Sequence, residues 1–177
     1  MKPAGAGRIE GYEPSIDVNC TVLVVGSMPS RRSLAAHEYY AHPQNRFWDF
    51  VEELFDIPRS MPHGERLASL RAHRVALWDV VQSCERETSA DSDIRSVQPN
   101  DFVGLLRRYP AIARVFCNGG KAFELWRRWV EARVAHELGR ELLVDRLPST
   151  SPAHASLHRA EKLAAWSILR TAVGLDC

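Results

Sequence analysis

The sequence has no apolar run that approaches the roughly 20 residues needed to span a membrane. Its first residues also lack the basic and then apolar pattern of a secretory signal peptide. With 10 prolines and 10 glycines among 177 residues, the composition is not that of a disordered chain. These absences argue against membrane-spanning and wholly disordered proteins, and we expect a folded protein of the cytoplasm with no membrane partner.

Closely spaced metal ligands are also missing. The four cysteines lie far apart and form no Cys-x-x-Cys pair. They are Cys20, Cys84, Cys117 and Cys177. Tetrahedral zinc sites and iron–sulfur clusters normally show close ligand pairs. We therefore expect reduced thiols and no metal site.

The chain has little excess charge of either sign. Lysine and arginine number 23, aspartate and glutamate 22, and the net charge is +1, which excludes a strongly basic tail for binding polyanions. The arginines are nevertheless grouped, in pairs at 31–32, 107–108 and 127–128. Such pairs can form a local basic patch on a near-neutral protein, although solvated surface positions are the simpler interpretation.

What the sequence does contain is an alternation of apolar runs and amphipathic segments. Residues 1–177 suit one domain, with 1–17 as a partly ordered lead-in. Strands are predicted at 20–26, 75–81, 112–117 and 141–147. Helices are predicted at 45–55, 66–72, 101–108, 121–136 and about 157–172, and 83–99 is predicted to be a polar loop. This order predicts an α/β fold whose parallel sheet is covered by helices on both faces.

Three loops with unusual composition follow predicted strands. They begin with Gly26-Ser27-Met28-Pro29-Ser30, with Asn118-Gly119-Gly120-Lys121 and with Pro148-Ser149-Thr150-Ser151-Pro152. In sheets of this type, ligands bind at the carboxyl ends of the strands. We therefore expect the three loops to gather around one site.

Hydroxyl groups in these loops suggest contacts with phosphate. Ser30 and Ser33 follow the first strand, where small hydroxyl residues can hold a phosphate, although an ordinary strand-to-helix turn is the simpler explanation. Lys121 follows the third strand and can meet a phosphate, or simply begin a helix. The glycines before it lack the spacing of a nucleotide-binding loop.

The loop after the fourth predicted strand carries similar signals. Ser149 and Ser151 offer hydroxyls, and Ser151 before a proline predicts a helix start whose free N–H groups favour an anion. His154 would then lie in the first helical turn, within reach of a ligand. A capped helix with an exposed histidine is the alternative. His154 and His158 have the spacing of a metal-ligand pair, but no third ligand is evident.

The segment Tyr39-Tyr40-Ala41-His42-Pro43-Gln44-Asn45-Arg46-Phe47-Trp48 has the highest density of chemistry-bearing residues. A base flipped out of DNA needs a flat aromatic wall and a polar group near its sugar. Tyr40 can supply the wall and Asn45 the polar group. Asn45 is equally suited to cap the following helix. Phe47 and Trp48, at the helix start, are expected to pack in the core.

Three segments together resemble the motifs of the uracil-DNA glycosylase superfamily. They are Gly26–Ser30, Tyr39–Trp48 and Leu147–Pro152. The closest resemblance is to its hypoxanthine-DNA glycosylase family, and it covers residues of about 20–172. The pattern His-Pro-x-Asn-x-Phe-Trp is specific for the superfamily. The resemblance implies a three-layer α/β/α sandwich with a four-stranded parallel sheet. It also implies hydrolysis of the N-glycosidic bond of a deaminated base, hypoxanthine or uracil, without metal or cofactor.

The resemblance also assigns residue roles. In the mismatch-specific branch an asparagine of the first loop positions water, but this chain has Met28 there, which cannot polarise water. Asn45 is then expected to take over, and Tyr40 falls where relatives place the stacking aromatic. His154 falls in the second motif as a further catalytic candidate. The base would contact Tyr40, Met28, Gly26 and Ser27, and DNA phosphates would contact Ser30, Ser33, Ser149, Ser151 and Lys121.

The expected partner is DNA that contains a deaminated base, bound by a monomer that associates with the nucleoid when it acts. Two other classes remain possible at the level of sequence. The departure at Met28 is compatible with a binding module for damaged DNA that has lost catalysis. An unrelated hydrolase with Ser27 or Ser30 as its nucleophile would need a neighbouring base and an orienting acid.

Overall fold

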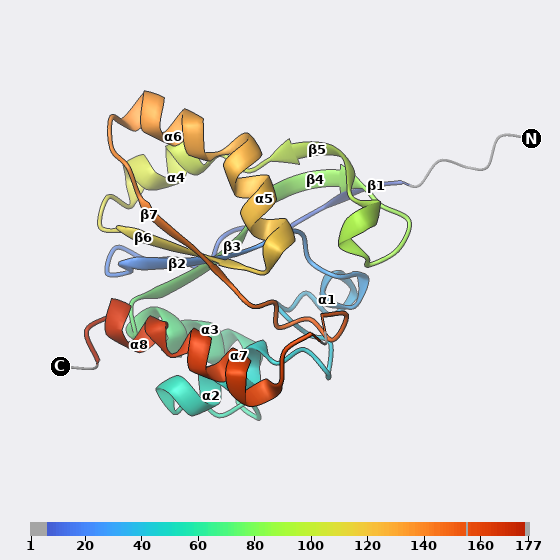
Figure 1. Cartoon of the computed structure of the whole chain (residues 1–177), viewed down its shortest axis with the longest axis vertical. Helices are drawn as coiled ribbons and strands as arrows, with labels where there is room; N and C mark the ends of the chain where they lie inside the picture. The colour runs from blue at the N-terminus through green and yellow to red at the C-terminus, as the bar shows by residue number, and fades with distance from the viewer. Residues whose placement is uncertain (1–6, 155, 176–177) are drawn as a thin grey trace, which may run out of the picture.

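A four-stranded parallel sheet forms the centre of the molecule. The computed structural model describes residues 7–154 and 156–175 of the 177-residue chain. The strands are β2 (Val22–Gly26), β3 (Val75–Asp79), β6 (Arg114–Asn118) and β7 (Leu143–Leu147), in the order β3-β2-β6-β7. All three neighbouring pairs are parallel (Figure 1). The parallel sheet predicted from the apolar runs is confirmed.

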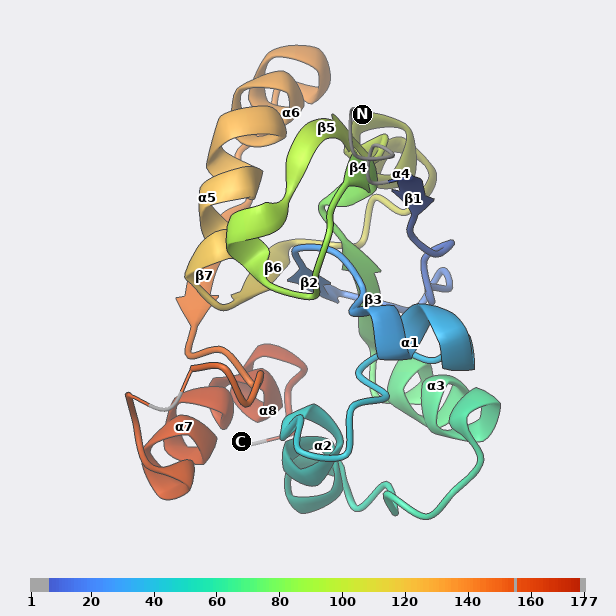
Figure 2. The same ribbon diagram turned by 90° about the vertical axis from the view of Figure 1, so that its right-hand side faces the viewer.

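Helices cover both faces of this sheet. One layer contains α4 (Phe102–Arg108), α5 (Gly120–Trp129) and α6 (Glu131–Leu138). The opposite layer contains α2 (Phe47–Phe55), α3 (His63–Ala72), α7 (Arg159–Trp166) and α8 (Ile168–Ala172). Figures 1 and 2 show the two layers above and below the strands, with α1 (Arg31–Ala36) beside the sheet. The three-layer α/β/α sandwich is therefore confirmed.

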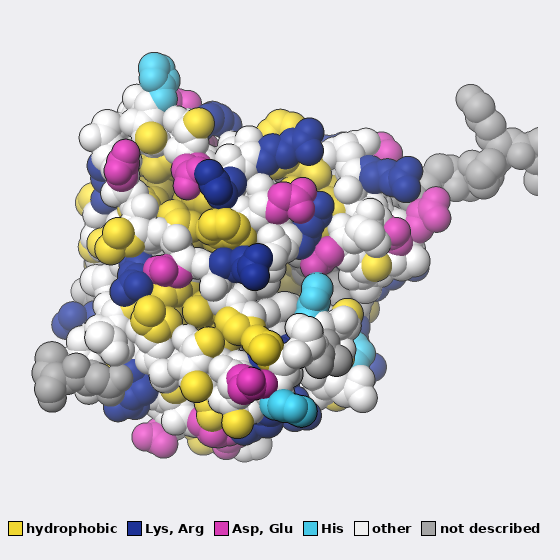
Figure 3. Space-filling model, viewed as in Figure 1, with side chains coloured by type: hydrophobic (Ala, Val, Ile, Leu, Met, Phe, Trp, Pro, Cys, Tyr) yellow, Lys and Arg dark blue, Asp and Glu magenta, His cyan; other side chains and the backbone are white. Residues whose placement is uncertain are grey.

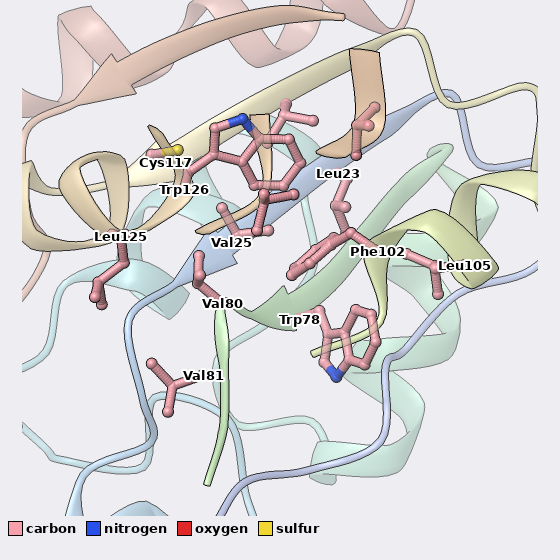
Figure 4. Packing of buried hydrophobic residues seen from close by; sticks show 14 of the residues in the cluster. Leu23, Val25, Trp78, Val80, Val81, Phe102, Leu105, Cys117, Leu125 and Trp126 are labelled. Carbon is pink, nitrogen blue, oxygen red and sulfur yellow. The ribbon is translucent and has the colours of Figure 1, made fainter. Parts of the chain in front are cut away.

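Each face of the sheet packs against its own hydrophobic cluster. Because successive strand residues point to opposite faces, Leu23 and Val25 belong to one cluster, and Val22 and Val24 to the other. In the first cluster the rings of Trp78, Phe102 and Trp126 follow one another, with neighbouring ring centroids 4.8 and 4.9 Å apart (Figure 4). In the second, Phe47 packs edge-on against Trp166. The two clusters hold the helix layers against the sheet.

A second, antiparallel sheet is a difference from the sequence prediction. It joins β1 (Arg8–Glu10), β4 (Val81–Glu85) and β5 (Arg95–Pro99) in the order β1-β4-β5. The prediction of a plain loop over 83–99 is therefore wrong, and the lead-in 1–17 contributes a strand. A short 3-10 turn, η1 (Asp91–Asp93), lies between β4 and β5.

Several helix boundaries also differ from the prediction. The expected helix over 121–136 is two helices that meet at Val130, whose φ and ψ are −117° and −50°. The last predicted helix is likewise divided, at Ser167. The prediction of a helix start at Ser151 is wrong, because α7 begins at Arg159 after a cap formed by His158 and Glu161. In the described part of the chain, no helix is long and apolar enough to cross a membrane.

Candidate active site

A large pocket lies where the parallel strands end. Its volume is about 580 Å³, within the range of small-molecule binding sites. Loops contribute residues 26–30, 89–92 and 149–154 to its lining, and single side chains come from Tyr40, Asn45, Asp79 and Asn118. The three loops expected from the sequence to converge thus meet here, and the β4–β5 connection joins them.

The loop after β2 forms one wall. Met28 is 6% exposed and belongs both to the pocket lining and to the core cluster beneath it. Gly26 allows a close approach, because a Cβ atom at this position would lie 2.5 Å from Oδ1 of Asp79 and 3.3 Å from the hydroxyl of Tyr40. Any larger residue at Gly26 would therefore displace two side chains that line the pocket.

Tyr40 stands in the pocket lining with a strained backbone. Its φ of 55° lies in the left-handed region that residues other than glycine rarely adopt. The ring stacks on Phe47, with centroids 4.1 Å apart and 28° between the planes. The hydroxyl is buried beside Asn118 without a well-formed hydrogen bond, and burial raises the pKa of the phenol above its usual value. Strain of this kind persists where the surrounding structure fixes a side chain, and often at functional sites.

Asn45 lies at the pocket directly before α2. Its Oδ1 accepts a hydrogen bond of 3.0 Å from the N–H of Phe47, the first residue of the helix. The N-cap of α2 is Arg46, so the prediction of Asn45 as the cap is wrong by one residue, although its side chain does bind the first N–H of the helix. Asn45 also lines the pocket. The expected packing of Phe47 and Trp48 in the core is confirmed, since they are 1% and 3% exposed.

Asp79 is a pocket residue that sequence reasoning missed. It ends β3, is 4% exposed, and its Oδ2 has no hydrogen-bond partner. Burial raises the pKa of this carboxyl to about 7; the charge of Arg86 opposes the rise and that of Asp91 adds to it. A single aspartate at the end of an apolar strand gives no sequence signal of such burial, because the burial depends on the packing of distant segments.

Asn118, which also escaped the sequence reasoning, joins two of the pocket loops. Its Nδ2 donates to Oγ1 of Thr150 at 2.9 Å, and its Oδ1 accepts from the N–H of Thr150 at 3.0 Å. Gly119 beside it has a φ of +96°, and a Cβ there would lie 2.9 Å from Cβ of Ser149. These contacts fix the loop after β7 against the end of β6.

The serines expected to bind phosphate participate in the turns of the loop after β2. Oγ of Ser30 accepts from the N–H of Ser33 at 3.1 Å and caps α1. Ser33 is 3% exposed, and its Oγ accepts from the N–H of Ala41 at 3.2 Å. Both serines line the pocket. A phosphate contact by Ser33 would require its hydroxyl to exchange these partners.

The loop after β7 is built in the same way. Oγ of Ser149 accepts from the N–H of Ser151 at 3.2 Å, and Oγ of Ser151 accepts from the N–H of Ala153 at 3.3 Å. Both serines are partly exposed at the pocket. Lys121, by contrast, is not part of the pocket lining, and its Nζ lies 3.3 Å from Oε1 of Glu124 on the same helix.

Lys162 of α7 stabilises the loop after β7 through hydrogen bonds. The residue is 7% exposed, and its Nζ donates to the carbonyl oxygens of Ser149, at 2.7 Å, and of His154. Burial lowers the pKa of the ammonium. One charged group thus holds both ends of the segment 149–154, which no short motif in the sequence suggests.

Replacing Lys162 with methionine is expected to lower the free energy of unfolding by about 1–3 kcal/mol, because two buried carbonyl groups lose a charged donor. Urea denaturation monitored by circular dichroism measures the change. Lys121→Met is the matched control, and its partly exposed ion pair should contribute less than about 1 kcal/mol. Equal losses of stability in the two variants would contradict the proposed role of Lys162 in stabilising the loop after β7.

His154 lies in the loop before α7 and not in the first turn of a helix, as the sequence suggested. Its side chain is 49% exposed, with Nε2 3.9 Å from Oδ2 of Asp91. Oδ1 of Asp91 accepts a hydrogen bond from Oγ of Ser27 at 2.7 Å. A serine nucleophile needs a hydrogen bond to the base itself. Here the acid lies between Ser27 and His154, and Ser30 donates to Ser33, so the geometry does not support a serine hydrolase.

Charged side chains of both signs are mixed over the face shown in Figure 3. Arg127 pairs with Glu131 and Arg107 with Glu137, as expected for solvated surface positions. The pair 31–32 differs, because it begins α1 next to the pocket and the N–H of Arg31 donates to Oγ of Ser89. Among the three arginine pairs of the sequence, this one has positive charge nearest the pocket lining.

No three His, Cys, Asp or Glu side chains among residues 7–154 and 156–175 are arranged to hold a metal ion. Cys20, Cys84 and Cys117 are buried free thiols, and Cys177 lies outside the described residues. Burial raises the pKa of Cys20 to about 11 and that of Cys117 to about 12. Such thiols are chemically inert and contribute to packing.

Comparison with known proteins gives consistent matches. A family model of the Uracil DNA glycosylase superfamily matches residues 13–170. The Hypoxanthine DNA glycosylase of Methanosarcina acetivorans is 36% identical over 115 residues, which are 64% of this chain and 73% of that protein. The Hypoxanthine DNA glycosylase of Methanosarcina barkeri is 34% identical over 116 residues, 65% and 73% of the two chains. A solution NMR structure from Methanosarcina acetivorans, described as a candidate uracil DNA glycosylase, has a TM-score of 0.77 and 29% identity, covering 94% of this chain and 99% of the other.

Proposed function

The chain belongs to the uracil DNA glycosylase superfamily and is a DNA glycosylase, and from this premise we propose that it removes hypoxanthine from DNA. The two relatives named for that base support the choice. Uracil, which shares the deaminated pattern of hydrogen-bonding groups, is the proposed second substrate. The alternative of a binding module without catalysis is set aside, because the family and the named relatives are enzymes.

One observation carries the proposal: the aromatic ring of Tyr40 and the amide of Asn45 line the same pocket. A glycosylase must bind a base outside the DNA helix, which requires a flat surface for the ring and polar groups near the sugar. Stacking on Phe47 fixes the ring of Tyr40, and the N–H of Phe47 fixes the amide oxygen of Asn45. The ring of Tyr40 and the amide of Asn45 are therefore both held in place by Phe47, the first residue of α2.

The proposed reaction begins with extrusion of the damaged nucleotide, which costs a few kcal/mol and least at a weakened base pair. As the bond between the base and the sugar breaks, positive charge grows on the sugar and negative charge on the base. Asn45 orients a water molecule toward the anomeric carbon. An amide does not accept a proton at neutral pH, so its contribution is positional and electrostatic.

The departing base carries the electron pair of the broken bond and needs a donor. We place His154 in this role, because it lines the same pocket as the β2 loop. The N–H groups of Thr150, Ser151, Ala153 and His154 already donate to acceptors within the protein. The base would also contact Gly26, Ser27 and Met28 in the β2 loop. Met28 offers no amide for water, and the catalytic amide is therefore assigned to Asn45.

The DNA backbone is proposed to lie across the rims of the two serine-containing loops. Ser30, Ser149 and Ser151 have hydroxyls at the pocket, and Ser33 would support the turn that presents Ser30. Lys121 is a more distant phosphate contact in this arrangement. All of these groups come from a single chain, and we propose a monomer as the active species.

The direct test uses duplexes with a single hypoxanthine or a single uracil, incubated with the protein and then treated with alkali to cleave abasic sites. We expect strand scission at hypoxanthine, and scission at uracil if both bases are substrates. A duplex with undamaged adenine at the same position is the control. Absence of scission with every deaminated base would reject the proposed substrate class.

Replacing Tyr40 with alanine should slow hypoxanthine excision about 10- to 100-fold, because stacking of a base on an aromatic ring contributes about 1–3 kcal/mol. Tyr40→Phe keeps the ring and removes only a hydroxyl without a well-formed hydrogen bond, so its rate should stay within about threefold of wild type. Single-turnover rates measure both. Equal losses in the two variants would contradict the stacking role.

A further inference from the structure

Tyr39 directly precedes the ring proposed to stack on the base, and side chains and backbone of other segments hold it in place. It is 5% exposed, and its N–H donates to Nε2 of His63, the first residue of α3, at 3.0 Å. Its carbonyl oxygen accepts from Nε1 of Trp48 in α2 at 2.8 Å. Its hydroxyl donates to the carbonyl oxygen of Glu13 at 2.9 Å. Both backbone groups and the hydroxyl of Tyr39 are therefore fixed by contacts with other segments.

The peptides on both sides of Tyr40 are anchored in this way. The carbonyl group of Tyr39 lies in the peptide before it, and the N–H of Ala41, in the peptide after it, donates to Oγ of Ser33 in α1 at 3.2 Å. A residue other than glycine keeps a φ of 55° only where the surrounding structure fixes its backbone. Contacts with α1, α2 and α3 therefore set the direction in which the ring of Tyr40 leaves the backbone.

Of these three contacts, the one from α3 depends on protonation. A backbone N–H is always a donor, so Nε2 of His63 must offer a free lone pair, and the proton of the neutral ring lies on Nδ1. A proton on Nε2 would place two donors against each other and break the hydrogen bond to Tyr39. Ser33 and Trp48, which form the other two contacts, do not change charge between pH 5 and pH 8. The anchoring of Tyr39 therefore requires the neutral ring of His63.

The surroundings of His63 favour its neutral form. Burial makes the largest contribution and lowers the pKa of the ring. Glu38, before Tyr39, raises this pKa and Arg66 of α3 lowers it, and these two side chains pair with each other, with 3.5 Å between Oε2 and Nη2. The phenol of Tyr39 lies 6.5 Å from the His63 ring between centroids, and burial raises its pKa, so it carries no charge at pH 7.

We propose that His63 is a positioning residue of the pocket: by accepting from the N–H of Tyr39, it holds the ring of Tyr40 in the orientation that stacks on the flipped base. His63 is not among the residues that line the pocket, so it acts through Tyr40 and not on the base itself. Protonation of His63 releases the peptide before Tyr39 and weakens stacking. The inference rests on the proposed function of the pocket and adds a group outside the pocket that controls it.

Two substitutions separate the acceptor from the bulk of the side chain. His63→Leu removes the acceptor, and we expect it to slow single-turnover excision of hypoxanthine at pH 7.5 about tenfold, because a binding group is misplaced. His63→Gln offers an amide oxygen to the N–H of Tyr39 and should stay within about threefold of wild type. His73→Leu is the matched control, a half-buried histidine at the other end of α3 whose ring bonds the carbonyl oxygen of Ser69. Equal losses in the glutamine and leucine variants, or equal losses at the two positions, would overturn the inference.

The pH dependence supplies a readout that a merely structural role would not move. The ratio of the wild-type rate to the His63→Gln rate should be constant above pH 7 and decrease as the pH falls, because only the wild type loses its acceptor by protonation. Acid effects on the base, on Asp79 and on His154 are common to both proteins and cancel in the ratio. A constant ratio over the range in which NMR shows the His63 ring to titrate would contradict the proposal.

A double variant tests whether His63 acts through Tyr40. In a Tyr40→Ala background, His63→Leu should change the excision rate less than about twofold, because the ring that it positions is already gone. A general weakening of the fold would lower the rate by the same factor in both backgrounds, and that result would overturn the inference. Lack of excision by the wild type would instead reject the proposed function. The bond to Tyr39 is tested in either case by nitrogen-15 NMR of the His63 ring, and a neutral ring with its proton on Nε2 would exclude it.

Discussion

Replacement of Asn45 with alanine is expected to slow hypoxanthine excision about 10²–10³-fold, the loss typical of removing one preorganised polar group that acts on the transition state. No other amide stands in the equivalent place of the β2 loop, where the chain has Met28. The binding of damaged duplex should change little, because the effect is expected in the chemical step. Single-turnover rates and binding titrations of the same protein separate the effect on the chemical step from the effect on DNA binding.

The hydrogen bond between Asn45 and the start of α2 makes a control necessary. Its Oδ1 accepts from the N–H of Phe47, and loss of a side-chain hydrogen bond to a helix start typically destabilises a protein by about 1 kcal/mol. Asn45→Ser keeps an oxygen that can cap the helix but lacks the amide. It should be nearly as stable as wild type and yet as slow as Asn45→Ala. If serine restored excision together with stability, the residue would act through the helix alone.

The sheet could be predicted from the sequence because its signal is local. Residues such as Val22–Val25 form short apolar runs, and a strand buried on both faces needs nothing else. The antiparallel sheet could not be predicted in this way. Ile9 of β1 pairs with Cys84 of β4, and the polar residues of β4 and β5 resemble a loop until their distant partner is known.

The site could be predicted in part for the same reason. Tyr40 and Asn45 lie in one dense segment, and the pocket loops follow the ends of strands, so pattern alone identifies them. Three other residues of the site depend on contacts with segments far away in the sequence: Asp79, Asn118 and Lys162. The residues next to them in the sequence do not indicate these contacts. The turns of segment 149–154, built by serine side chains, likewise resembled a helix start in the sequence.

The second large effect concerns stability. The pKa of Asp79 is raised from an ordinary value of 3.8 to about 7 in the folded protein. A carboxyl of this kind holds more protons when the chain is folded, so the free energy of unfolding decreases as the pH rises from about 4 through about 7 and stays low above it. Asp79→Asn removes the charge, and the variant should be more stable than wild type at pH 8.5 by up to about 4 kcal/mol.

Urea denaturation of both proteins at pH 4.5 and pH 8.5 measures this difference, which should be small at the lower pH because the acid and the amide are then both neutral. Asp145→Asn is the matched control, since its partly exposed carboxylate pairs with Arg114 at 2.9 Å and its loss should cost at most about 1 kcal/mol. A variant at Asp79 that is less stable than wild type at pH 8.5 would mean that the carboxylate is stabilised when folded. The result therefore decides whether the chain retains a destabilising acid at the pocket, which is expected of residues that serve a site at the expense of stability.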